Sequence, residues 1–254
     1  MLIEDKFIYV SLPRRGSTSF HYSCILHNFD IKPLQPHWEI HNSQIDFTSI
    51  NECDIMNYIG HGHEPLNDLQ KKFGNHYPII AVNRDRHDAF YSLFKHIIFD
   101  LKRAGFDKIA EHFSNLSSDE LFFWDTFDLL SPDNKRKKIN DYLYKNKLVS
   151  NPNIKIPIKL SLNSEEYVVN TISILLTPIS YWHNHNKDII WFDITDLSKM
   201  EEWVSDITYK EFKIKNVNSS KHMDCNLKLD DNFIKRYNNI YDYYDKQKNI
   251  KTLI

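Results

Sequence analysis

The sequence is poor in cysteine and has no long apolar run. Its three cysteines, Cys24, Cys53 and Cys225, are far apart, and no two stand at metal-ligand or redox spacing. No segment approaches the about 18 apolar residues that a membrane-spanning helix needs. The amino terminus also lacks the basic region and apolar stretch of a secretory signal. We therefore expect a protein of a reducing, cytoplasmic compartment that is not held in a membrane.

A strong net charge is missing as well. The formal net charge is −2 and the isoelectric point is near 6.7, which argues against a protein that coats nucleic acid. Any anion site must therefore be local. The 254 residues are 41% hydrophobic and 14% aromatic, enough for a sizeable core. Because we find no internal repeat, low-complexity tract or linker, we expect one domain over residues 1–254.

Short apolar runs alternate with helical patterns along the chain. Residues 7–12, 78–82 and 189–194 read as buried strands, each followed by a helical stretch. Between residues 90 and 101, apolar side chains recur every three to four positions, which predicts a long amphipathic helix. This alternation predicts an α/β fold with a parallel sheet. Weaker patterns predict loops over residues 30–58, helices over 105–150, an edge strand near 154–158, and helices at 200–204 and 233–244.

Residues 13–19, Pro-Arg-Arg-Gly-Ser-Thr-Ser, lie where the first strand should turn into a helix. Such a turn places backbone N–H groups and the positive end of the helix dipole around one point. Arg14 and Arg15 add positive charge, and the hydroxyls that follow can cap the helix or bind an oxyanion. An ordinary capped helix with two solvated arginines fits the same residues. A nucleoside-triphosphate loop does not, because Gly-Lys-Ser/Thr is absent.

The segment Leu12 to Phe20 resembles the 5′-phosphosulfate loop of sulfotransferases that use 3′-phosphoadenosine 5′-phosphosulfate (PAPS). That family has a second motif, an arginine at a strand end and a serine eight residues later, which bind the 3′-phosphate. Arg84 and Ser92 have this spacing. The chain departs from the family pattern by carrying Arg86 in place of a proline and Ala89 in place of a second arginine. The resemblance implies that the cofactor-binding residues are Arg14, Arg15, Gly16, Ser17, Thr18, Ser19, Arg84 and Ser92.

Between these two motifs stands a His-Gly-His segment at residues 61–63. It is similar to the segment of the uronyl and heparan 2-O-sulfotransferases that carries the catalytic base. The resemblance implies that His63 is the base and that His61 assists it or contacts the cofactor. Two other interpretations stay open, namely histidines without a role and a metal site with Glu64 or His76. The pairs His37 with His41 and His183 with His185 are better explained as surface loop residues.

The carboxyl-terminal third carries looser similarities. Residues 190–197 resemble the strand and turn that follow in these enzymes, or form a simple core strand. Asn218 and Lys221 resemble the late loop that folds over the adenosine and its 3′-phosphate, although a polar loop before the last helix fits equally well. The basic run 135–138 could meet an anionic acceptor, but such runs are more often solvated helix faces.

Together these similarities imply a three-layer α/β/α domain of P-loop kinase-like type, with a central parallel sheet of about five strands. The implied reaction moves a sulfuryl group from PAPS to an acceptor hydroxyl and leaves adenosine 3′,5′-bisphosphate. Arg14 would stabilise the leaving phosphate, and no metal is required. The acceptor would be a carbohydrate or another small molecule, with neither nucleic acid nor membrane as partner. Two alternatives remain: a kinase-like nucleotide phosphotransferase, and a non-catalytic anion- or glycan-binding module, which Ala89 favours.

Overall fold

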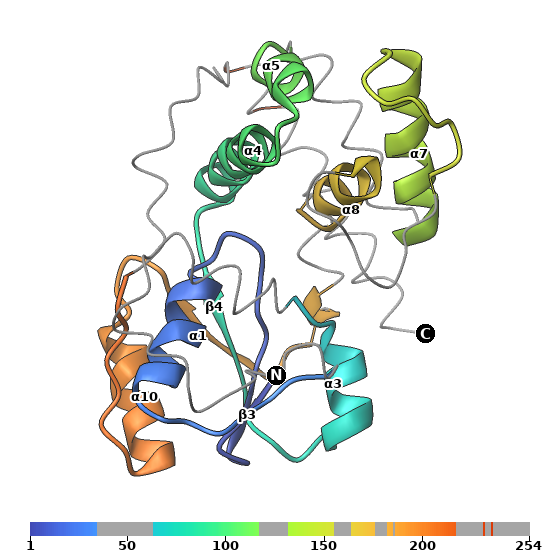
Figure 1. Cartoon of the computed structure of the whole chain (residues 1–254). Coiled ribbons are helices and arrows are strands. Elements are labelled where there is room, and N and C mark those ends of the chain that lie inside the picture. The colour runs from blue at the N-terminus through green and yellow to red at the C-terminus, as the bar shows by residue number, and fades with distance from the viewer. Residues whose placement is uncertain are drawn as a thin grey trace. The chain divides into compact units, whose positions relative to one another are not determined.

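The computed structural model describes residues 1–34, 63–116, 132–154, 164–175, 182–184 and 186–216, together with Asp231 and Lys235. Within these residues lie five strands and seven helices, a mixed α/β composition (Figure 1). The chain divides into two compact units. The first comprises Met1–Ala89 and Pro178–Ser220, and the second comprises Phe90–Thr177 and Lys221–Ile254. The expectation of a single domain over residues 1–254 stays a prediction.

The first unit is built on a five-stranded sheet with strand order β3-β1-β2-β4-β5. Three neighbouring strands, β2, β4 and β5, run parallel, whereas β1 is antiparallel to both β2 and β3. The expectation of about five strands is confirmed, and the expectation of a parallel sheet is wrong because the sheet is mixed. The strands are β1 (Leu2–Ile3), β2 (Phe7–Tyr9), β3 (Ile31–Lys32), β4 (Ile79–Asn83) and β5 (Ile189–Asp193).

A tight hairpin before β2 makes β1 antiparallel and the sheet mixed. Glu4 and Asp5 adopt left-handed backbone angles, with φ of 53° and 50°, and the amide of Lys6 donates to the carbonyl of Ile3 at 2.9 Å. The chain therefore reverses within a few residues, and β1 has to pair antiparallel with β2. A two-residue strand is too short to show the alternation by which strands are recognised in a sequence.

Helices α1 (Ser17–Leu26) and α10 (Ser198–Thr208) cover one face of this sheet. Alternate strand residues point to that face, and they pack with α1 and α10 into one buried cluster. Figure 1 shows α1 and α10 on one side of the strands and α3 (Leu66–Phe73) on the other. The helices expected after residue 16 and at 200–204 are confirmed. The cluster includes Phe7, Tyr9, Phe20, Cys24, Ile80, Val82, Met200 and Val204.

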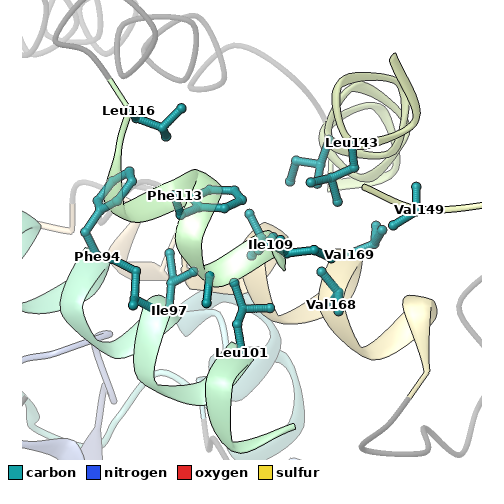
Figure 2. Close-up of a cluster of buried hydrophobic side chains, with 14 of the residues drawn as sticks. Phe94, Ile97, Leu101, Ile109, Phe113, Leu116, Leu143, Val149, Val168 and Val169 are labelled. Carbon is teal, nitrogen blue, oxygen red and sulfur yellow. The ribbon is translucent and has the colours of Figure 1, made fainter. Parts of the chain in front are cut away.

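The second unit has a helical core. It contains most of α4 (Arg86–Arg103), with α5 (Asp107–Ser114), α7 (Pro132–Lys145) and α8 (Glu165–Leu175). Figure 2 shows side chains from these helices meeting in a buried apolar cluster. The expected stripe on α4 is confirmed, since its apolar residues supply one wall. The labelled members are Phe94, Ile97, Leu101, Ile109, Phe113, Leu116, Leu143, Val149, Val168 and Val169.

Some sequence expectations fall partly or wholly beyond this description. The edge strand expected near residues 154–158 is described only at Ile154, which lies outside any strand and packs against the second unit's core. In the basic run on α7, Arg136 and Lys138 are half-buried and Lys137 is exposed. The stripe expected at 233–244 lies outside the described residues, apart from a helical Lys235. Among the described helices, none has the length and apolar character required to cross a membrane.

Candidate functional site

The loops after β2 and β4 lie at a topological switch point of the sheet. β2 and β4 are adjacent and parallel, with Ile8 opposite Ile79 and Tyr9 opposite Ile80. After β2 the next strand, β3, lies on one side of this pair, whereas after β4 the next strand, β5, lies on the other. In α/β sheets, ligands bind outside the carboxyl ends of strands at such a point. Residues 10–16 and 84–85, which leave these two ends, are therefore placed where a ligand site is expected.

The loop 13–16 enters α1 through two residues with left-handed backbone. Arg14 has φ of 57° and Gly16 has φ of 75°. Gly16 is the N-cap residue of α1, and no side chain caps the helix there. This corrects the expectation that a serine or threonine hydroxyl caps α1. The first turn also contains no acidic residue, so the positive end of the helix dipole is not offset by a carboxylate within the helix.

Two arginines join this loop to the end of β4. The Arg15 side chain is only 5% exposed, and its Nη1 donates to Asn83 Oδ1 at 2.8 Å and to the Arg84 carbonyl at 2.9 Å. In return, Arg84 Nη1 donates to the Arg14 carbonyl at 3.1 Å. The two segments that carry the family-like motifs are about 70 residues apart in sequence and are directly bonded. Two positive side chains, Arg15 and Arg84, therefore meet at this switch point, next to the main chain of Arg14.

His63 contacts the same loop from a third segment. Its Nδ1 lies 2.9 Å from the Ser11 carbonyl oxygen and 3.3 Å from Ser11 Oγ. A carbonyl oxygen only accepts, so Nδ1 carries a proton in this contact and Nε2 is the nitrogen that gains or loses one. The ring also packs against Trp182, with centroids 5.7 Å apart. This tautomer suits a general base that acts through Nε2.

Two buried polar residues are associated with His63, His21 through its electrostatic interaction and Glu64 as its neighbour in sequence. His21, on α1, is 3% exposed, and its pKa is held well below the ordinary value by burial first, then by the Met1 amine and by His63. Glu64 is 6% exposed and accepts from the Leu34 amide at 2.5 Å, while its Oε2 lies 3.3 Å from the Met1 amine. Glu64 thus ties the His63 segment to the chain just after β3.

The other predicted site residues are distributed as follows. Ser17 and Ser19 are buried in the first turn of α1, and Thr18 is half-buried beside them. Ser92 is 1% exposed on the part of α4 that belongs to the second unit. Ala89, which stands where the family has an arginine, is 8% exposed. His61, Asn218 and Lys221 lie outside the described residues.

Several residues of this site were missed by sequence reasoning. Ser11 and Asn83 accept hydrogen bonds from predicted site residues, Trp182 packs against His63, and His21 interacts with His63 electrostatically. Ser11 and Asn83 could have been found from their place at the ends of predicted strands, where parallel sheets hold their ligand-binding residues. Nothing in the sequence around His21 or Trp182 distinguishes them from ordinary core residues.

A metal centre has no support in the described part of the chain. There, no group of three or more histidine, cysteine, aspartate or glutamate side chains could hold a metal ion. Glu64 is oriented toward the Leu34 amide and the Met1 amine rather than toward a shared point with His63 and His76.

No family model, curated protein or solved structure matches this chain. A functional assignment therefore depends on the contacts described above.

Proposed function

We propose that this chain is a PAPS-dependent sulfotransferase that transfers a sulfuryl group to an acceptor hydroxyl. The observation that carries the proposal is the meeting of three family-like segments at one switch point. The loop that follows β2, the strand end at Arg84 and the histidine at position 63 are joined by hydrogen bonds within the first unit. This convergence at the end of the sheet where α/β folds bind ligands supports the proposal.

The site suits an anion with several negative charges. The Arg84 guanidinium is bonded to the main chain of Arg14, and α1 begins just after this loop without an acidic residue in its first turn. Backbone N–H groups at a helix start and arginine side chains are the groups that proteins use for phosphate and sulfate. We assign the 5′-phosphosulfate to Arg14 and residues 16–19 and the 3′-phosphate to Arg84. The roles of Ser92, Asn218 and Lys221 in binding the cofactor rest on the family resemblance alone.

PAPS, when bound, supplies a sulfuryl group on a phosphate leaving group. His63 Nε2 accepts the proton of the acceptor hydroxyl while that oxygen attacks sulfur. The new bond joins the acceptor oxygen to sulfur, and the bond that breaks joins sulfur to the 5′-phosphate oxygen. Arg14 and the first N–H groups of α1 stabilise the charge that grows on this oxygen. The Ser11 carbonyl holds the imidazole in the tautomer that this step needs.

A three-layer α/β/α architecture of P-loop kinase-like type belongs to the same proposal. It is supported by the parallel core β2-β4-β5, by the switch point between β2 and β4, and by α1 and α10 opposite α3 (Figure 1). In this arrangement β1 and β3 extend the sheet beyond the ligand site and do not alter it. The acceptor is proposed to be a carbohydrate or another small hydroxyl compound.

Sulfate transfer tests the proposal directly. The purified protein is incubated with PAPS labelled in the sulfuryl group and a panel of glycans and small hydroxyl compounds. We expect labelled product with at least one acceptor class, together with stoichiometric adenosine 3′,5′-bisphosphate. An Arg84→Ala variant should lose transfer, whereas Arg103→Ala, which removes an exposed arginine at the end of α4, should keep it. Equal activity in the two variants would contradict the assignment of Arg84.

A further inference from the structure

We propose that Arg15 is a positioning residue that holds Arg84 against the loop 13–16, and that it does not itself contact the cofactor. This inference rests on the proposed function and divides the three arginines of the site into two roles. Arg14 and Arg84 would face the anion, and Arg15 would fix the distance between the two loops that carry them.

The burial of Arg15 is the first observation. Its side chain is 5% exposed, although it stands in a loop among polar residues. Burial of a guanidinium is costly unless its N–H groups find oxygen acceptors. Nη1 has two such acceptors at the end of β4, Asn83 Oδ1 at 2.8 Å and the Arg84 carbonyl at 2.9 Å. The end of this side chain is therefore bonded to the protein's own strand.

The reciprocal bond from Arg84 is the second observation. Arg84 Nη1 donates to the Arg14 carbonyl at 3.1 Å, so each arginine binds the main chain of the other's segment. Within the described residues, this is the one hydrogen bond of the Arg84 side chain. A guanidinium has five N–H donors, so Arg84 retains donors for an anion. Arg84 is also half-buried, whereas Arg15 is almost fully enclosed.

The backbone geometry gives the third observation. Arg14, whose carbonyl accepts from Arg84, has φ of 57°, a left-handed conformation that costs about 1–2 kcal/mol for a residue with a side chain. Such a conformation persists where surrounding contacts fix it. The bonds of Arg15 and Arg84 on either side of this peptide supply those contacts. Losing Arg15 should therefore loosen Arg84 and the 3′-phosphate subsite more than the start of α1.

Nucleotide binding to matched variants tests this division of roles. Calorimetry compares adenosine 3′,5′-bisphosphate with adenosine 5′-monophosphate, which lacks the 3′-phosphate, on wild type and on Arg15→Met. Without Arg15 to hold it, Arg84 should lose one charge-assisted hydrogen bond to the 3′-phosphate, which should weaken bisphosphate binding about tenfold. Binding of the monophosphate should stay within about twofold, since its phosphate meets Arg14 and α1. Asn83→Ala should show the same pattern to a smaller degree, and Arg103→Met should change neither affinity. An equal loss for both nucleotides would overturn the inference, because it is what a direct 5′-phosphate contact predicts.

Thermal unfolding supplies a second test that needs no ligand. Arg15→Met and Asn83→Ala should each lower Tm, and the double variant should lower it by no more than the larger single change. Additive shifts would show that the two side chains do not act together and would overturn the inference. If the wild type binds neither nucleotide, the proposed function fails, and the Tm comparison alone then decides whether Arg15 joins the two loops.

Discussion

The Nδ1 atom of His63 lies 2.9 Å from the carbonyl oxygen of Ser11, across 52 positions of the sequence. This contact fixes both the place and the tautomer of the imidazole. The place is the start of the loop that leads from β2 to the amino-terminal end of α1. The tautomer leaves Nε2 as the atom that can accept a proton, which is what the attack of a hydroxyl on sulfur requires.

Replacement of His63 by alanine should therefore abolish transfer and leave the cofactor affinity nearly unchanged. General base catalysis contributes about a hundredfold to ten-thousandfold to a rate, so a loss in that range is expected in kcat. The matched control is His76→Ala, which removes an exposed histidine of the same unit. Both variants are assayed for transfer and titrated with adenosine 3′,5′-bisphosphate. A large loss of affinity in the His63 variant would mean that His63 binds the cofactor instead.

Arg14 should show a conflict between stability and binding. Its φ of 57° is shared by Lys147, an exposed residue of the second unit. Glycine removes about 1–2 kcal/mol of backbone strain at such a position. Its greater conformational entropy in the unfolded chain lowers the stability of the folded state by about 0.5–1 kcal/mol, which offsets part of this gain. Arg14→Gly and Lys147→Gly should therefore both hold or slightly raise Tm. Only Arg14→Gly should weaken bisphosphate binding, and unchanged binding would remove Arg14 from the site.

Tyr9 should be a stabilising site for phenylalanine. Its side chain is fully enclosed and stacks on Phe20 with ring centroids 4.0 Å apart, and its hydroxyl has no hydrogen-bond partner among the described residues. A buried unsatisfied hydroxyl costs about 1–3 kcal/mol. Tyr9→Phe should raise the free energy of unfolding by about 1 kcal/mol in urea titration. Tyr209→Phe, at a position that is 88% exposed, should change nothing. A destabilised Tyr9→Phe would reveal a partner for the hydroxyl.

His21 should make the fold less stable in acid. Burial holds its pKa well below 6.5 in the folded state, whereas the unfolded chain takes up a proton near 6.5. The unfolded state therefore binds more protons as the pH falls below 6.5, and stability decreases. The urea midpoint is measured at pH 7.5 and 5.5, about one unit either side of the pKa of histidine in the unfolded chain. The fall in midpoint between these two conditions should be smaller for His21→Gln than for wild type. His76→Gln should behave as wild type does. If the midpoint of His21→Gln falls as much as that of wild type, the pKa of His21 is the same in the folded and unfolded states, and the prediction is wrong.

The parts of the fold that were predicted have strong local signals. The runs that became β2, β4 and β5 are apolar and end at polar or turn residues, and the stripe on α4 repeats over several turns. The parts that were missed depend on distant contacts. The hairpin at Glu4 and Asp5 pairs β1 with β2, and β3 then pairs with β1. A two-residue strand has no sequence pattern of its own from which it could have been predicted.

The site divides in the same way. Residue types and the family resemblance predicted that Arg14, Arg84 and His63 belong to one site. Their segments are joined by hydrogen bonds, and the role of the site stays a prediction. Residue types and spacing could not show that Arg15 is buried against Asn83, since a loop arginine next to a glycine gives no indication of the direction of its side chain. Nor could they identify the Ser11 carbonyl as the acceptor that fixes His63, because any residue can offer a main-chain oxygen.

The most direct test of the central claim is a calorimetric titration of the wild-type protein with three ligands. These are adenosine 3′,5′-bisphosphate, ATP and a sulfated oligosaccharide. The account predicts saturable binding of the bisphosphate that is at least about tenfold tighter than that of ATP and that weakens as salt is raised. A preference for ATP would favour a nucleotide phosphotransferase, and binding of the oligosaccharide alone would favour a non-catalytic module. Failure to bind the bisphosphate would contradict the proposed sulfotransferase.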